Sequence, residues 1–381
     1  MKDTHLQAYG VGKILTMAPD RPPVADGLLV AANGIIQEIG PYRELKKQYS
    51  GPIQDLGPRL MVPGLINAHT HLELSHLQGR TVTGQGFEDW VQSLIKLPLK
   101  GIEIQTLARI RQDLLAGGTV GVGDISGHSP GFMQDFLSGS GLLFHLFLEQ
   151  IGYTNRGSLD LPRYGEQKET HLSPSGHALY STHPVTLQQV KTWCRERGHP
   201  FAIHLAEHPG EVEFLTTGQG RFADILKQGL LPKGYCPPGL SPVTHADRLG
   251  LLDQGTLAVH VVHAEPHEIG LLARRGVRVC LCPRSNALIN VGRAPAKQLF
   301  EAGISLCLGT DSLCSNHDLD LWAEAAFFAR DLDMDLGLVQ LLALITRNPA
   351  AILNLDKAIG TLERGKRALF SLVPEELSCE Y

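Results

Sequence analysis

Short apolar runs alternate with amphipathic helical patterns through the middle of the chain. Predicted strands lie at residues 64–71, 119–125, 142–150, 178–182, 202–206, 256–262, 277–282 and 304–309. Apolar positions at helical spacing separate most of them, at residues 104–116, 186–197, 266–275 and 294–302. An α/β fold is indicated, and eight strands with intervening helices predict a distorted (β/α)8 (TIM) barrel.

The rival architecture is an open, doubly wound parallel sheet. The first predicted strand is not followed by the glycine-rich GxGxxG turn of dinucleotide-binding sheets, and this favours the barrel. Residues 218–250 are irregular and rich in Gly and Pro, so we expect a loop excursion on one face of the barrel.

The two chain ends carry a different pattern. Residues 13–17, 27–31 and 35–39 are brief β-type runs, and Asn33-Gly34 between the last two is a strong hairpin signal. A similar stretch runs from residue 360 to residue 373. Because neither end is long enough for a core of its own, we expect one small β-sandwich domain made of residues 1–58 and 356–381. The barrel, residues 59–355, would be inserted between them.

Composition narrows the class of protein. The chain has 381 residues, of which 43% are apolar and 19% charged, an ordinary globular balance. A net charge of −5 argues against a nucleic-acid partner. No uninterrupted apolar run is long enough to span a membrane, the start lacks an apolar signal segment, and seven cysteines show no framework spacing. We therefore expect a cytoplasmic enzyme that acts on a small molecule.

Histidine and aspartate residues gather near the ends of predicted strands. His69 and His71 end the first strand, His204 and His260 lie in the fifth and sixth, and Asp311 follows the eighth. Barrel active sites lie at the carboxyl ends of the strands, so we expect these side chains to converge. Three imidazoles and a carboxylate suit zinc, or iron as an alternative, with a position left open for water.

Each of these residues has a structural alternative when it is taken alone. A strand-end histidine such as His204 is often a hydrogen-bonded structural residue. Asp311 could cap the following helix, and Glu207 could simply open a helix where the dipole favours a carboxylate. Together, however, they supply the groups that one hydrolytic mechanism needs.

Several motifs, in this order along essentially the whole chain, resemble the amidohydrolase superfamily, in particular its cytosine deaminase and chlorohydrolase-like branch. They are Pro63-Gly-Leu-Ile-Asn-Ala-His-Thr-His71, His204-Leu-Ala-Glu207, Cys282-Pro-Arg-Ser-Asn286, Leu308-Gly-Thr-Asp-Ser312 with Ser315-Asn316, and Ile359-Gly-Thr-Leu-Glu-Arg-Gly-Lys366.

The resemblance implies a mononuclear site and a hydrolytic deamination. One divalent metal ion would be bound by His69, His71, His204 and Asp311. Glu207 would shuttle protons, and His260 would polarise the substrate or orient the water. Asp311 would accept the proton of the water, whose hydroxide adds to the amino-bearing ring carbon and releases ammonia. Binuclear relatives use a lysine from the fourth strand, and residues 177–183 contain none.

The substrate is the least determined part of the prediction. The run His69-Thr-His-Leu-Glu-Leu-Ser75, followed by Phe87-Glu-Asp-Trp90 and Tyr180-Ser-Thr182, looks most like the aminodeoxyfutalosine deaminases of menaquinone biosynthesis. The candidate substrate contacts are Glu73, Trp90, His177, Arg284 and Ser312. Glu73 could instead form a salt bridge, Trp90 could belong to the core, and Arg284 could be a surface residue.

Other activities remain open on this fold. They include deamination of adenosine, S-adenosylhomocysteine, methylthioadenosine, guanine or cytosine, and hydrolysis of a chlorinated ring or a cyclic amide. Lys100 stands near the position where adenosylhomocysteine deaminases usually place a ribose-binding glutamate, which weakens that alternative. A catalytically inactive binding protein on the same fold would lack a tightly bound metal. We expect a monomer or a homodimer.

Overall fold

Eight parallel strands among the described residues form the central part of the molecule. The computed structural model describes residues 5–153, 171–331 and 336–379. One four-stranded sheet contains β6 (Leu65–Thr70), β7 (Thr119–Ser126), β8 (Leu143–Gln150) and β9 (Leu172–Gly176). The other contains β10 (Phe201–Leu205), β11 (Thr256–His260), β12 (Arg278–Leu281) and β13 (Leu306–Leu308).

Single bridges join the two sheets at both edges. Ala178, just after β9, pairs in parallel with His204 of β10, and Thr70 at the end of β6 pairs in parallel with Asp311 beyond β13. The strands therefore follow one another in sequence order and return to the first. This arrangement of parallel sheets is consistent with a barrel of the (β/α)8 type.

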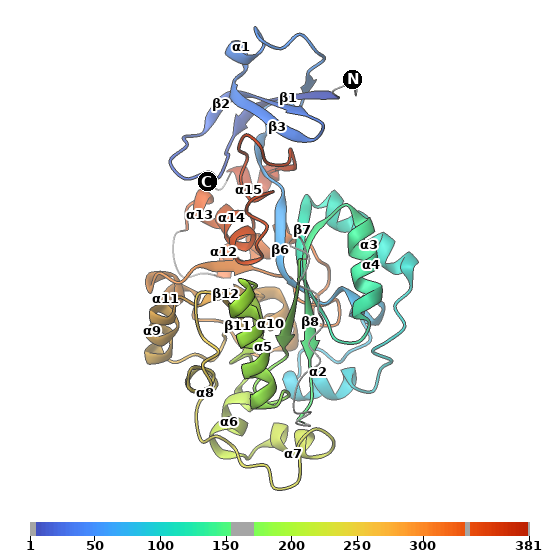
Figure 1. The fold of residues 1–381 in the computed structure, drawn as a ribbon, viewed down its shortest axis with the longest axis vertical. Coiled ribbons are helices and arrows are strands. Elements are labelled where there is room, and N and C mark those ends of the chain that lie inside the picture. Colours follow the sequence, from blue (N-terminus) through green and yellow to red (C-terminus); the bar gives the residue numbers. More distant parts are fainter. Residues whose placement is uncertain (1–4, 154–170, 332–335, 380–381) are drawn as a thin grey trace.

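Helices cover the outside of the strands and extend from one end of them (Figure 1). A short helix, α1 (Tyr42–Leu45), precedes the barrel. The described helices between β6 and β11 are η1 (Leu72–Leu77), α2 (Phe87–Leu94), α3 (Ile104–Ala116), α4 (Pro130–Ser140), α5 (Pro184–Arg197), α6 (Pro209–Thr217), α7 (Arg221–Lys227) and α8 (Pro242–Arg248). The later ones are α9 (Pro266–Arg275), α10 (Pro283–Ile289), α11 (Ala296–Glu301), α12 (Leu321–Asp331), α13 (Leu338–Ala343), α14 (Arg347–Ile352) and α15 (Glu375–Cys379).

Two of the sequence predictions for this region need correction. Residues 218–250 are not only a loop, because they contain the short helices α7 and α8. The fourth strand is Leu172–Gly176, whereas residues 178–182 form a turn with single bridges. A proline inside a segment argues against a central strand, so Pro174 hides β9 in the sequence, yet this strand pairs with β8 along five residues. His177 therefore follows the strand instead of preceding it.

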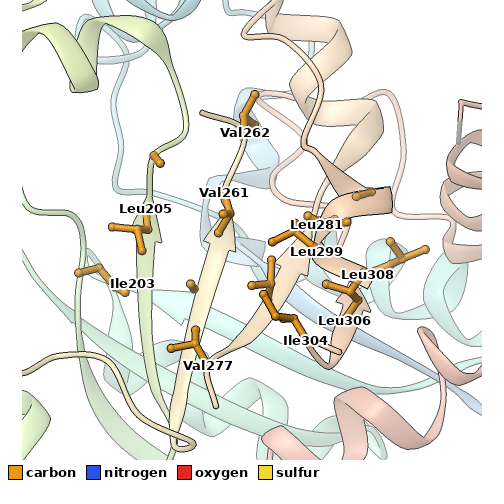
Figure 2. Close-up of a cluster of buried hydrophobic side chains, with 14 of the residues drawn as sticks. Ile203, Leu205, Val261, Val262, Val277, Leu281, Leu299, Ile304, Leu306 and Leu308 are labelled. Atoms are coloured by element: carbon orange, nitrogen blue, oxygen red, sulfur yellow. The ribbon is translucent and has the colours of Figure 1, made fainter. Parts of the chain in front are cut away.

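Strand residues alternate between two apolar layers. Ala202, Leu257, Val259, Cys280 and Cys307 belong to an inner cluster that also contains Ile66 and Ala68. Their sequence neighbours belong to the outer cluster, which packs against the helices. Figure 2 shows this layer, with Ile203 and Leu205 of β10, Leu306 and Leu308 of β13, and Leu299 of α11. His204 has the inner parity, which turns its ring toward the barrel interior.

A third sheet combines strands from both chain ends, and it lies at the top of Figure 1. Its order is β14 (Phe370–Leu372), β5 (Leu60–Pro63), β1 (Leu6–Ile14), β2 (Val24–Ala32) and β3 (Ile35–Pro41), and β4 (Gln54–Asp55) also pairs with β1. The predicted hairpin is confirmed, since β2 and β3 pair antiparallel across Asn33 and Gly34, both with positive φ.

The first strand of this sheet was misplaced by the sequence prediction, because β1 covers Leu6–Ile14 and residues 15–17 lie outside it. The sandwich arrangement and the domain limits at residues 58 and 356 stay predictions. Within the described ranges, no helix has both the length and the apolar character required to cross a membrane.

Candidate active site

Four side chains from three parts of the barrel meet at the carboxyl ends of the strands. His69 Nε2 lies 3.2 Å from His71 Nε2, and His71 Nε2 lies 3.4 Å from His204 Nε2. Asp311 Oδ1 lies 3.6 Å from the Nε2 atoms of both His69 and His71. The structure thus brings together the four residues that the sequence analysis predicts as metal ligands.

These separations suit a tetrahedral ion. Two nitrogen ligands of zinc lie about 3.3 Å apart, because each Zn–N bond is about 2.0–2.1 Å long. Two overlapping groups of candidate ligand atoms among the described residues extend the cluster, one with His260 and one with Glu149 and His177. Both groups include His204, so they outline one site. The four predicted ligands therefore fit a divalent metal ion.

Hydrogen bonds orient the candidate ligands. His204 Nδ1 donates to the carbonyl of His177 at 3.0 Å, so its Nε2 keeps the lone pair that a metal requires. Asp311 Oδ2 accepts hydrogen bonds from the hydroxyls of Ser285 and Ser315, both at 2.7 Å. Asp311 Oδ1 is thereby left to face the imidazoles.

Burial keeps the imidazoles of His71 and His204 neutral. Burial lowers the pKa of His71 to about 3, and the neighbouring His69 adds to this effect. Burial also lowers the pKa of His204 well below its ordinary value. Burial alone would raise the pKa of Asp311, but the neighbouring His69, His71 and His260 bring it well below the usual range. Neutral nitrogens beside a carboxylate are the protonation states that metal binding needs.

Glu207 and His260 face each other beside this cluster. Glu207 Oε1 lies 3.5 Å from His260 Nε2, and both side chains are buried. His260 Nδ1 donates to Asn286 Oδ1 at 3.0 Å, since an amide oxygen can only accept. Burial raises the pKa of Glu207 well above its ordinary value, with Asp311 and Glu211 adding to the rise. Glu207 therefore tends to carry a proton that it can donate.

Left-handed backbone marks the strand ends of this site. Ala206, His260 and Asp311 have φ values of 51°, 73° and 60°, which non-glycine residues rarely adopt. The side chain of Val259 points to the inner cluster, so regular strand alternation would turn the next side chain, that of His260, toward the outer layer. The left-handed residue instead lets the imidazole approach Glu207.

Five residues were predicted from the sequence as substrate contacts, and the structure gives most of them protein partners. Glu73 accepts hydrogen bonds from Ser126 Oγ and from the backbone N–H groups of residues 127–129. Both of its carboxylate oxygens are engaged by the segment after β7. In this structure Glu73 therefore organises a loop and does not present a free carboxylate to a ligand.

Three more of these candidates are similarly engaged. Trp90 Nε1 donates to the carbonyl of Cys314 at 2.9 Å. Arg284 forms a two-pronged ion pair with Asp318, at 2.6 and 2.9 Å. Ser312 is buried, and its hydroxyl contacts Ser315 Oγ at 3.2 Å and accepts from the Cys314 N–H. Because the Arg284 guanidinium already pairs with Asp318, it is not free to bind an acidic substrate.

His177 is the predicted contact that lies against the ligand cluster. Its ring centroid is 4.9 Å from that of His204, and its Nδ1 lies 2.5 Å from Ser181 Oγ. Burial and, to a lesser extent, the neighbouring His69 lower the pKa of His177 to about 4. A neutral His177 can offer its other nitrogen to a bound molecule.

Among the described residues, sequence reasoning missed three carboxyl groups at this end of the barrel. Glu149 lies near the end of β8 close to His177, and its Oε1 is buried without a hydrogen-bond partner in the described part of the chain. Asp124 of β7 accepts hydrogen bonds from Thr70 Oγ1 and the Leu72 N–H, both at 2.9 Å. Glu211 lies behind Glu207. Asp124 and Glu149 also lie near the carboxyl ends of their strands, so the criterion that selected the histidines applies to them as well.

A family model agrees with this architecture. The model for the amidohydrolase family matches residues 60–379. The chain belongs to the amidohydrolase family. The resemblance stated from its motifs is thereby confirmed, and members of this family are typically metal-dependent, in agreement with the His and Asp cluster.

Similar amidohydrolases include named deaminases. The chain is 31% identical to the 5-methylthioadenosine/S-adenosylhomocysteine deaminase of Moorella thermoacetica, over 95% of this chain and 86% of that protein. It is 28% identical to the aminodeoxyfutalosine deaminase of Deinococcus radiodurans, over 80% of this chain and 76% of that protein. Aminofutalosine deaminase of Helicobacter pylori, solved with methylthio-coformycin, shares the fold with a TM-score of 0.85 at 24% identity, covering 96% of this chain and 91% of that one.

Proposed function

We propose that this amidohydrolase is a metal-dependent aminohydrolase that replaces the amino group of an adenine-type ring in a nucleoside by oxygen and releases ammonia. 6-Aminodeoxyfutalosine, an intermediate of menaquinone biosynthesis, is the first-choice substrate. The observation that carries the proposal is the Glu207 carboxyl, 3.5 Å from His260 Nε2 and adjacent to four convergent metal-ligand side chains. A proton donor beside a metal site is what hydrolytic removal of a ring amino group requires.

The proposed metal ligands are His69, His71, His204 and Asp311, for one zinc ion with iron as the alternative. Their ligand atoms lie 3.2 to 3.6 Å apart where they face one another, which supports a single ion. A divalent ion bound there would lower the pKa of a coordinated water to about 7 and polarise it for attack.

The side chains around the ion would move the protons. Asp311 would take the proton of the attacking water through Oδ1. Glu207 would give its proton to the ring nitrogen next to the reacting carbon and then relay a proton to the departing amine. His260, oriented by Asn286, would direct its Nε2 toward the oxygen that enters the ring. Glu149 and His177, on the neighbouring strand ends, would hydrogen-bond the substrate.

A second candidate substrate class is supported by the relative from Moorella thermoacetica, whose name places it among the 5-methylthioadenosine and S-adenosylhomocysteine deaminases. The two substrate classes share the adenine ring and differ in the group carried at the far end of the ribose. The reaction proposed above applies unchanged to both.

The test is ammonia release from metal-loaded protein with aminodeoxyfutalosine, 5-methylthioadenosine, S-adenosylhomocysteine, adenosine, guanine and cytosine. Wild-type protein is compared with Glu207→Gln, which keeps the shape of the side chain and removes its acid function. Turnover of one adenine nucleoside, lost in the variant, supports the proposal and identifies the substrate. Bound metal without turnover of any member of the panel would refute deamination of adenine nucleosides.

A further inference from the structure

Glu207 follows a turn that is difficult for the backbone. The strand β10 ends at Leu205, and Ala206 then adopts a left-handed conformation with φ 51°. The carbonyl of Ala206 accepts a hydrogen bond from the His263 N–H at 2.9 Å. The direction in which Glu207 leaves the strand therefore depends on contacts that stabilise this turn.

Glu211 supplies one of these contacts directly to Glu207. Its Oε2 accepts the backbone N–H of Glu207 at 2.8 Å. Glu211 is fully buried, and within the described residues its Oε1 has no hydrogen-bond partner. A buried carboxyl group with one unsatisfied oxygen is costly, so its retention calls for a specific reason.

The structural alternative is that Glu211 only caps the helix α6. It occupies the third helical position after the N-cap His208, where a glutamate commonly reaches back to the N-cap N–H. Here, however, the carboxylate passes the N-cap and bonds the residue before it, which is Glu207. The bond thus acts on the proposed proton donor and not on the end of the helix.

The helix α9 offers an internal comparison. Glu268 occupies the same third position and forms a complete capping box with Glu265, accepting its N–H at 2.9 Å. The other oxygen of Glu268 accepts hydrogen bonds from Ser241 and Thr244. A glutamate that serves only as a cap in this protein is therefore fully satisfied, whereas Glu211 is not.

We propose that Glu211 is a positioning residue for Glu207, fixing through the Glu207 N–H the direction in which the proton donor enters the active site. The proposal rests on the function proposed above, and it concerns the placement of Glu207 rather than the choice of substrate. Placement matters because a shift of about 1 Å in a reacting group lowers the rate about a hundredfold.

The experiment compares Glu211→Ala and Glu211→Gln with the matched cap variant Glu268→Ala. Glu211→Ala removes the acceptor, so we expect kcat to fall about a hundredfold with KM and metal content unchanged. Glu211→Gln keeps an acceptor oxygen at the same place and should restore most of kcat. Glu268→Ala should lower the melting temperature without changing kcat.

Amide hydrogen exchange gives a readout that needs no substrate. The Glu207 amide should exchange faster in Glu211→Ala than in wild type, and remain protected in Glu211→Gln and Glu268→Ala. A Glu211→Ala variant that loses only stability, with normal kcat and a protected Glu207 amide, would overturn the proposal, as would a Glu211→Gln variant as impaired as Glu211→Ala. If wild-type protein deaminates nothing in the panel, the proposed function fails, and the exchange comparison still decides whether Glu211 fixes Glu207.

Discussion

Two serine hydroxyls determine how Asp311 can present its carboxylate to a metal. Ser285 and Ser315 each donate to Asp311 Oδ2 at 2.7 Å, and all three residues are buried. A hydrogen bond to a charged group contributes about 1.5–3 kcal/mol. These hydrogen bonds also form in the metal-free protein, so only part of their free energy contributes to metal binding. We therefore expect Ser285→Ala and Ser315→Ala each to lower metal affinity about tenfold. This is the lower end of the loss of about 10- to 100-fold that is typical when a hydrogen-bond partner of a metal ligand is removed.

The double variant should lose more than the two single effects together. With both hydroxyls gone, Asp311 Oδ2 becomes a buried charged oxygen without these partners, and residues that share one partner do not act additively. The assay is competition with a chromophoric chelator for zinc, with melting curves to confirm folding. Ser175→Ala is the matched control, because the Ser175 hydroxyl is buried and has no hydrogen-bond partner in the described part of the chain. Wild-type zinc affinity in a folded double variant would refute Asp311 as a ligand oriented in this way.

Three further predictions follow from buried polar groups. Asn286→Leu removes the acceptor for His260 Nδ1, so kcat should fall about a hundredfold while metal content, measured by elemental analysis, stays at the wild-type level. Glu149→Gln should raise KM for the adenine nucleoside more than it lowers kcat if this carboxyl group hydrogen-bonds substrate, and unchanged steady-state kinetics would argue against that role. Burial holds the pKa of His145 well below its ordinary value in the folded state, so the unfolded state takes up a proton at this residue below about pH 6.5. The contribution of His145 to folding stability should therefore fall by about 1.4 kcal/mol per pH unit as the pH drops below that value. Urea unfolding of His145→Gln should show a shallower loss in acid than wild type, whereas His267→Gln, at an exposed position, should not.

The strand-end criterion succeeded where the sequence pattern and the topology agree. His69, His71, His204 and Asp311 were selected because they follow apolar runs, and parallel strands bring their carboxyl ends to one end of a barrel. The fold class and the convergence of these side chains could therefore be predicted from one sequence. The fourth strand could not, because Pro174 lies inside it and residues 178–182 have a more strand-like composition.

Contacts between distant segments explain most of what the sequence did not reveal. Glu73 looked available to a substrate, but the loop after β7 surrounds its carboxylate, and that loop lies more than fifty residues away in the chain. Asn286 acquires its role only because α10 places it against His260. Neither partner is local, so no helical or strand periodicity signals these interactions.

The strained strand ends are the part of the site furthest from sequence prediction. Positive φ values are expected at glycine, yet Ala206, His260 and Asp311 adopt them at a cost of about 1–3 kcal/mol each. A hydrogen bond from neighbouring structure accompanies each one: the Asp311 N–H donates to His69, the Val261 N–H donates to Leu205, and the Glu207 N–H donates to Glu211. The first two bonds join neighbouring strand ends, whereas the third comes from the helix that follows β10. The conformation of Asp311 therefore depends on contact between the last and first strands of the barrel, and that of Ala206 depends on bonds to Glu211 and His263. The geometry of the proposed metal ligand and of the proposed proton donor thus depends on contacts outside the motifs that contain them.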